Sequence, residues 1–193
     1  CKSAISEHIR MNIIYVYKAL ALWGGIERII IDKMNYFSEQ YGHNVTIITT
    51  SQNDHIIPYP LSSKIKHIDL NIRFHTKYQH NKLKQLWIGH QMNVKFKKLL
   101  KEQFNIINPD IIIVTTDLYM DVVTQLANGI PIIAESHSDK IQTLLSNNGK
   151  KLNIIKRYKQ NRYLKSINKV TRLVTLTKQD AKMWNIPEKT VII

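Results

Sequence analysis

Short runs of β-branched and aliphatic residues recur along the chain, and most are nearly continuous in hydrophobicity rather than alternating with polar residues. Such runs are typical of parallel strands that are buried on both faces of a sheet. They predict seven strands, at residues 12–17, 45–50, 65–70, 110–116, 130–136, 172–177 and 190–193.

Helical patterns separate most of these runs. From Gly25 to Gln40, apolar residues recur with the 3.6-residue period of an amphipathic helix. Further helices are predicted at 82–101, 117–129, 151–167 and 177–184. Strands that alternate with helices imply right-handed βαβ crossovers. The predicted fold class is therefore α/β, a doubly wound, Rossmann-like and mostly parallel sheet of seven strands.

The length of 193 residues allows one sizeable core, and a hydrophobic fraction of 44% is ordinary for a globular protein. Because Met11 directly precedes the first predicted strand and looks like a natural start, we interpret residues 1–10 as an N-terminal extension and residues 11–193 as the Rossmann-like domain. A strand at the very end of the sequence suggests that a second domain normally follows.

The charge is strongly basic, with 28 Lys and Arg against 14 Asp and Glu and a net charge of +14. Such a chain attracts nucleic acid, anionic lipid or phosphorylated substrates. The segment 82–101 combines lysines with apolar residues and is either an interfacial membrane helix or a packed helix with a solvated lysine face. These residues are Lys82, Lys84, Lys95, Lys97, Lys98 and Lys101 with Trp87, Phe96, Leu99 and Leu100.

Candidate chemistry lies where predicted strands end, because ligands of open α/β sheets bind at the carboxyl ends of strands. Gly24 and Gly25 precede a helix, where backbone N–H groups can approach a phosphate or sugar closely. The alternative is a tight turn that needs a positive φ. Glu27 can be a first-turn acid that suits the helix dipole, and Arg28 can be merely solvated.

Three further strand ends carry polar residues. Asp117 is either a ligand-binding residue or, more simply, the N-cap of its helix. His137 follows a buried strand beside Glu135 and can bind a sugar hydroxyl or phosphate or transfer a proton. Thr177 and Lys178 open another helix, and a cap with a surface lysine explains them.

Several classes of site have no motif in the sequence. There is no GxGxxG fingerprint, no P-loop, no GxSxG elbow, no Asp-x-Asp and no His/Cys cluster with metal-ligand spacing. We therefore expect no metal. Helix-turn-helix, RRM and zinc-finger patterns are also absent, so nucleic acid is not the expected partner.

The motifs in their order resemble family 4 glycosyltransferases of the GT-B fold. The resemblance covers Met11 to Ile193 and rests on the glycine pair with Glu27 and Arg28, on "YGHNVTIITT" (41–50), and on three later strand segments. These segments are "PDIIIVTT" (109–116), "IPIIAESHSD" (130–139) and "VTRLVTLTKQDAKMW" (170–184).

This resemblance implies a retaining transfer of a sugar from a nucleotide-sugar donor to a saccharide or lipid-linked acceptor, in cell-surface polysaccharide synthesis. It implies no cofactor and no metal, a cytoplasmic location with peripheral binding to an anionic membrane, and a C-terminal nucleotide-binding domain that is absent from this chain. Without that domain, the chain is expected to be inactive.

The resemblance also assigns roles to residues. It implies a catalytic His137, donor binding by Gly24, Gly25 and Arg28, and acceptor binding by Glu27, Asp117 and Glu135. Two alternatives stay open, a nucleotide-sugar epimerase of GT-B fold and a basic nucleic-acid-binding module.

Overall fold

The computed structural model describes residues 9–116, 118–137 and 154–193. Seven parallel strands form one sheet in the order β3-β2-β1-β4-β5-β6-β7. The strands are β1 (Asn12–Tyr17), β2 (Asn44–Thr49), β3 (Lys66–Asp69), β4 (Ile111–Thr115), β5 (Ile132–Ser136), β6 (Arg172–Thr175) and β7 (Thr190–Ile192). The predicted fold class and all seven predicted strands are therefore confirmed.

The sheet reverses its order at β1, which is the pattern of a doubly wound fold. From β1 the chain steps outward to β2 and β3, and then returns to the other side of β1 to add β4 through β7. Registers such as Ile13 with Val45 and Ile13 with Ile111 place β1 at the centre. Ligands of doubly wound sheets bind near such a switch in strand order.

One face of the sheet packs against α1 (Gly25–Glu39). The period-3.6 pattern directs Ile30, Ile31 and Met34 of this helix onto the sheet, where all three are buried. They meet alternate residues of β1 and β2, including Ile13 and Ile47. Because side chains of a strand alternate between faces, the remaining residues of β1 and β2 form the core on the other side.

The second face is covered by the later helices, whose apolar residues join one core with β1, β4 and β5. The helices are α2 (Lys82–Ile107), α3 (Met120–Leu126), α5 (Ile154–Ile167) and α6 (Lys178–Trp184). Two 3₁₀ helices, η1 (Phe74–Gln79) and η3 (Pro187–Lys189), complete the described elements.

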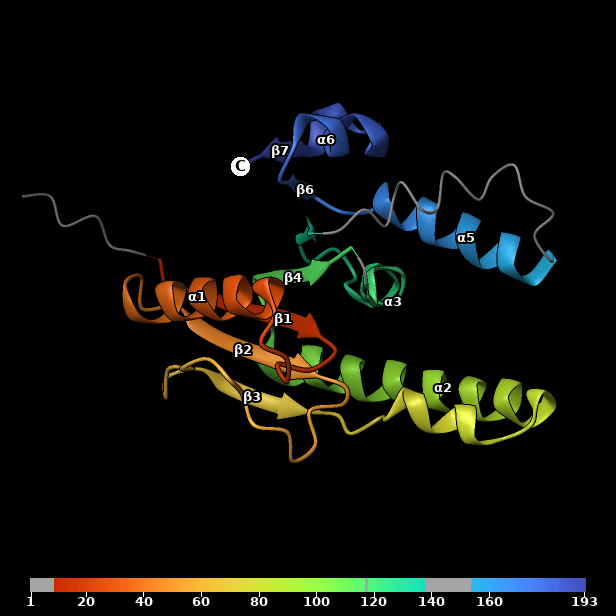
Figure 1. Cartoon of the computed structure of the whole chain (residues 1–193). Helices are drawn as coiled ribbons and strands as arrows, with labels where there is room; N and C mark the ends of the chain where they lie inside the picture. The colour runs from red at the N-terminus through yellow and green to blue at the C-terminus, as the bar shows by residue number, and fades with distance from the viewer. Residues whose placement is uncertain (1–8, 117, 138–153) are drawn as a thin grey trace, which may run out of the picture.

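Helix α2 is much longer than the strands that it crosses. Its 26 residues span about 39 Å, whereas a six-residue strand spans about 20 Å. The buried Phe96, Leu100 and Phe104 all belong to its C-terminal half. The N-terminal half extends with η1 beyond the carboxyl ends of the strands (Figure 1).

Two helix ends differ from the sequence prediction. Helix α3 begins at Met120 with Tyr119 in the N-cap position, so the predicted cap by Asp117 is wrong, and Asp117 itself lies outside the described residues. Tyr119 takes a left-handed conformation, with φ 61° and ψ −2°, which ends any helix that would begin earlier. The predicted cap of α6 is confirmed, since the Thr177 side chain accepts a hydrogen bond from the Asp180 N–H.

Candidate functional site

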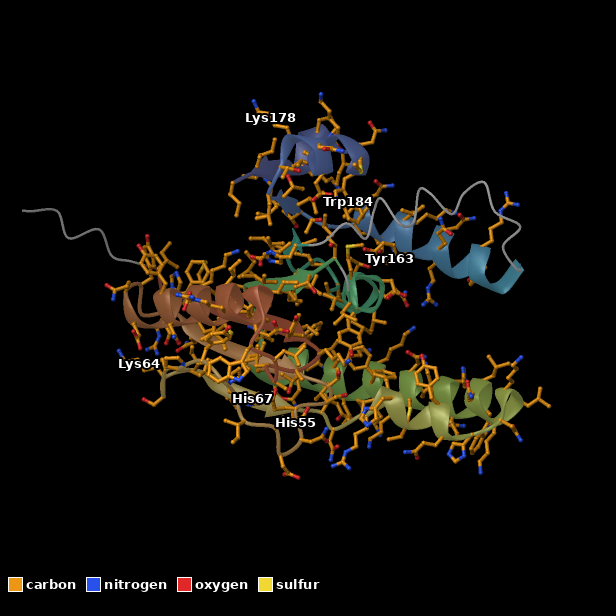
Figure 2. The ribbon with its side chains drawn as sticks, in the orientation of Figure 1. His55, Lys64, His67, Tyr163, Lys178 and Trp184 are labelled. Carbon is orange, nitrogen blue, oxygen red and sulfur yellow. The ribbon has the colours of Figure 1, made fainter. Side chains whose placement is uncertain are left out.

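The carboxyl ends of all seven strands meet at one edge of the sheet, because every pairing is parallel. Figure 2 shows this edge near His55, which follows β2, whereas Lys64, which precedes β3, lies at the opposite edge. The described residues among the predicted site residues follow β1 or lie at the end of β5, and they therefore converge at the edge where such folds bind ligands.

The two glycines after β1 have different structural reasons. Gly24 has extended backbone angles, φ −96° and ψ 155°, and neither it nor Gly25 has a positive φ, so the alternative of a positive-φ turn is wrong. A Cβ on Gly24 would collide with the carboxylate of Glu27. A Cβ on Gly25 would have no described atom within 4 Å. The lack of a Cβ at Gly24 thus makes room for the Glu27 carboxylate of the same helix, whereas the space beside Gly25 is open.

Glu27 is turned under the glycine pair rather than toward solvent. It is 6% exposed, and its Oε1 accepts a hydrogen bond of 3.0 Å from the Tyr17 hydroxyl at the end of β1. The carboxylate therefore joins the first strand to the first turn of α1. Acceptor binding by Glu27 stays a prediction.

Arg28 lies on the solvent side of α1. Its Nε is 3.7 Å from Oδ2 of Asp32, and both side chains are about two-thirds exposed. An exposed i,i+4 pair of this kind contributes only about 0.3–0.5 kcal/mol to stability. The pair leaves Arg28 able to turn to another anion, and donor binding by Arg28 stays a prediction.

A chain of three charged or ionisable groups, two of them buried, links α1 to the end of β5. Lys33 donates a hydrogen bond of 2.9 Å to Oε1 of Glu135, and Nε2 of His137 lies 2.9 Å from Oε2 of the same carboxylate. The side chains of Glu135 and His137 are only 5% and 2% exposed. Nδ1 of His137 has no hydrogen-bond partner among the described residues. The structure thus brings His137 and Glu135 into contact and adds Lys33.

The ionisation of Glu135 reflects these partners. Burial raises the pKa of the carboxyl, but hydrogen bonds from His137 and Lys33 and the charges of both groups outweigh burial and lower its pKa below the ordinary value. Burial, with a smaller contribution from the Glu135 charge, raises the pKa of the nearby Tyr15 hydroxyl well above its usual range. Glu135 is therefore an anion at neutral pH with both oxygens engaged, and its binding of an acceptor stays a prediction.

A second group of residues at the same edge escaped the sequence analysis. They line an open hollow of about 340 Å³, named here the β1–β2 hollow, which lies between the ends of β1 and β2, η1, α2 and the start of α3. Its lining includes Lys18, Ser51, Phe74, His75, Lys77, Tyr78, Asn93, Leu118 and Tyr119. These residues come from five separate segments without a shared motif, and only the net basic charge hinted at them.

The remaining predicted features have a structural explanation. Thr177 caps α6, and Lys178 is the exposed first residue of that helix. In α2, Trp87 is exposed, but Phe96 and Leu100 are fully buried and Leu99 is half-buried. For these three residues the alternative of a packed helix is confirmed, because they pack in the core. Membrane association of the chain stays a prediction. Among the residues that the structure describes, no helix is long and apolar enough to cross a membrane, and no three His, Cys, Asp or Glu side chains form a metal site.

Comparisons with known proteins agree with this architecture. The family model described as Glycosyltransferase Family 4 matches residues 23–191. The structure is similar to the lipopolysaccharide outer core galactosyltransferase WaaB in its apo form, with 13% identity, a TM-score of 0.60, and coverage of 93% of this chain and 44% of that chain. It is also similar to a sucrose-phosphate synthase from Thermosynechococcus elongatus, with 13% identity, a TM-score of 0.64, and coverage of 94% and 47%.

At these identities the structural likeness shows the fold. The chain spans less than half the length of both enzymes. A search of curated proteins gives no significant match.

Proposed function

Since the chain belongs to glycosyltransferase family 4, we propose that it is the acceptor-side, N-terminal half of a retaining glycosyltransferase. The reaction moves a hexosyl group from a nucleotide-sugar donor to a saccharide or lipid-linked acceptor and releases a nucleoside diphosphate. It needs neither a metal nor another cofactor, and it needs a second, nucleotide-binding domain.

The observation that carries this proposal is the open approach to the N-terminus of α1. The first-turn N–H groups of a helix carry a partial positive charge and bind phosphate oxygens. At Gly25 no described atom fills the space that a side chain would take, and the one acid of the first turn, Glu27, is buried and bonded to Tyr17. Negative charge that develops on a departing diphosphate would be stabilised at this point.

His137 supplies the second group of the proposed site. Glu135 accepts from Nε2 and cannot act as a donor while ionised, so in the neutral form of the imidazole the proton lies on Nε2 and Nδ1 is an acceptor. An imidazole with one nitrogen fixed and the other without a partner among the described residues suits a sugar hydroxyl. We assign the contact with the reacting sugar to His137, and the orientation of its ring to Glu135 and Lys33.

The N-terminal half of α2 supports a peripheral association with anionic membranes, where the chain would act in cell-surface polysaccharide synthesis on the cytoplasmic side. Leu83, Leu86 and Trp87 are 82%, 61% and 62% exposed, and Lys82 and Lys84 beside them are exposed as well. Exposed apolar side chains among lysines are the composition of an interfacial helix.

The test is transfer by the intact protein from a panel of UDP- and GDP-sugars to an array of immobilised glycans. We expect nucleoside diphosphate release coupled to a glycoside whose anomeric configuration matches that of the donor. Gly25→Val should abolish transfer without lowering the melting temperature, because a Cβ at this position meets no described atom within 4 Å. Free epimerised sugar without a glycoside, or normal transfer by Gly25→Val, would overturn the proposal.

A further inference from the structure

The lining of the β1–β2 hollow combines two kinds of side chain. Lys18, His75 and Lys77 supply basic nitrogens, and Phe74, Tyr78 and Tyr119 supply aromatic rings. None of the described lining residues carries a carboxylate. The volume of about 340 Å³ falls at the lower end of the range for small-molecule sites.

Lys77 is held in place rather than free in solvent. Its Cδ would lie 3.6 Å from a Cβ placed on Gly89 of α2, so its aliphatic stem passes over the one glycine of that helix. Its Nζ lies 5.0 Å from the centre of the Tyr78 ring. A lysine whose stem is packed loses less conformational entropy on binding an anion than a freely rotating one.

Tyr119 also lines the hollow, in a strained backbone conformation. A bulky residue at φ 61° is unfavourable by about 1–2 kcal/mol. The surroundings maintain it, since its hydroxyl lies 2.7 Å from the Thr50 Oγ1 and its ring packs against Phe96 with 4.9 Å between centroids. Strain that the surrounding structure maintains is concentrated at ligand sites.

Basic side chains continue beyond the rim of the hollow. A neighbouring depression of about 290 Å³ shares His75 and adds Arg73, His55 and Asn53, with Asp54 as its one acidic residue. Arg73 also has a left-handed backbone, and its Nε donates to Oδ1 of Asn71. The β1–β2 hollow therefore carries the net positive charge of Lys18 and Lys77, whereas in the neighbouring depression Asp54 balances Arg73.

From these features we infer that the β1–β2 hollow binds an anionic saccharide, a sugar that carries a phosphate or carboxylate group. The rings of Tyr78 and Tyr119 would contact the apolar C–H face of the sugar, and Lys77, Lys18 and His75 would bind the anion. This inference rests on the proposed function in one respect, that the anionic saccharide is the acceptor of the transfer. Binding itself requires no turnover.

The test is equilibrium binding to the intact protein, measured by titration calorimetry with glucose 6-phosphate, glucuronate, glucose and inorganic phosphate. We expect at least one of the two anionic sugars to bind about ten-fold or more tightly than glucose, and their order tells whether phosphate or carboxylate is preferred. Lys77→Gln should weaken binding of that sugar about ten-fold. Tyr78→Leu should weaken binding of the sugar but not of inorganic phosphate.

Lys64→Gln is the matched control, because it removes the same charge at the opposite edge of the sheet (Figure 2). Equal affinity for glucose and for both anionic sugars would overturn the inference. An equal loss of affinity in Lys64→Gln and Lys77→Gln would also overturn it, because net charge alone would then explain the binding. If the protein binds an anionic sugar specifically but transfers no hexose, the hollow is still an anionic-saccharide site. Only the proposed function is then refuted.

Discussion

Lys33 in the middle of α1 and Glu135 at the end of β5 are 102 positions apart in sequence, and their side chains meet at 2.9 Å. The contact ties the first helix to the strand that carries His137. Because Glu135 is buried, its carboxylate needs both Lys33 and His137 to offset the loss of water. The position of the His137 ring therefore depends on a residue of α1.

Replacing Lys33 with Met leaves this buried carboxylate short of one partner. Loss of one member of a buried pair costs about 3–5 kcal/mol, and the 28% exposure of Lys33 reduces this to about 2 kcal/mol. Urea unfolding at pH 7 would measure the change. Lys98→Met, an exposed lysine of α2, should change stability by less than about 0.5 kcal/mol. Equal losses in both variants would contradict a special role for Lys33.

Glu135 also makes stability depend on pH. Because its pKa is lower in the folded chain than the ordinary value of 4.5, its ionisation stabilises the fold above pH 4.5, and this contribution is lost as the pH falls through the lowered pKa. We expect the stability difference between the wild type and Glu135→Gln to shrink as pH falls from 6 to about 3, measured by urea unfolding. A difference that stays constant over this range would contradict the assignment.

The tautomer of His137 follows from the same carboxylate. With Glu135 ionised, the neutral imidazole carries its proton on Nε2, which ¹⁵N-detected NMR of the labelled protein would show directly. In Glu135→Gln the amide can donate as well as accept, so both tautomers should become populated. His67 provides an internal reference, since its Nε2 contacts the Thr49 hydroxyl in β2 and should not respond to the change.

Much of the sheet could be predicted from sequence, because parallel strands buried on both faces appear as continuous apolar runs. The same pattern predicted that His137 and Gly24 lie at the carboxyl edge of the sheet. It did not predict which residues contact them. Lys33 resembles any polar residue of an amphipathic helix, and nothing local shows that it reaches β5.

The half of α2 that packs on the sheet and the first residue of α3 could not be predicted from sequence either, because both depend on tertiary contacts. The burial of Phe96 and Leu100 depends on which half of α2 lies over the sheet, and both halves of segment 82–101 combine lysines with apolar residues. Asp117 looked like a cap because Asp is a good cap, but the left-handed backbone of Tyr119 starts α3 later. That conformation is stabilised by tertiary contacts with Thr50 and Phe96.

The two glycines should respond differently to substitution with Ala. Gly24→Ala forces the Glu27 carboxylate away from Tyr17 and should destabilise the protein by about 1–2 kcal/mol. Gly25→Ala should change stability by less than about 0.5 kcal/mol, because its Cβ enters open space. Thermal unfolding measures both. In a Glu27→Ala background, most of the penalty of Gly24→Ala should disappear, and a penalty that persists in full would exclude the collision as its cause.

The two halves of α2 should separate stability from membrane binding. Phe96→Ala removes a fully buried ring and should cost about 3–5 kcal/mol of stability. Trp87→Ala should leave stability within about 0.5 kcal/mol but weaken binding to liposomes of anionic lipid about ten-fold, measured by co-sedimentation. Ile106→Ala is the control, since Ile106 is 70% exposed at the other end of the same helix and should not affect liposome binding. Equal binding of the wild type to neutral and anionic liposomes would contradict the electrostatic part of the proposal, and unchanged binding by Trp87→Ala would contradict the role of the exposed apolar residues.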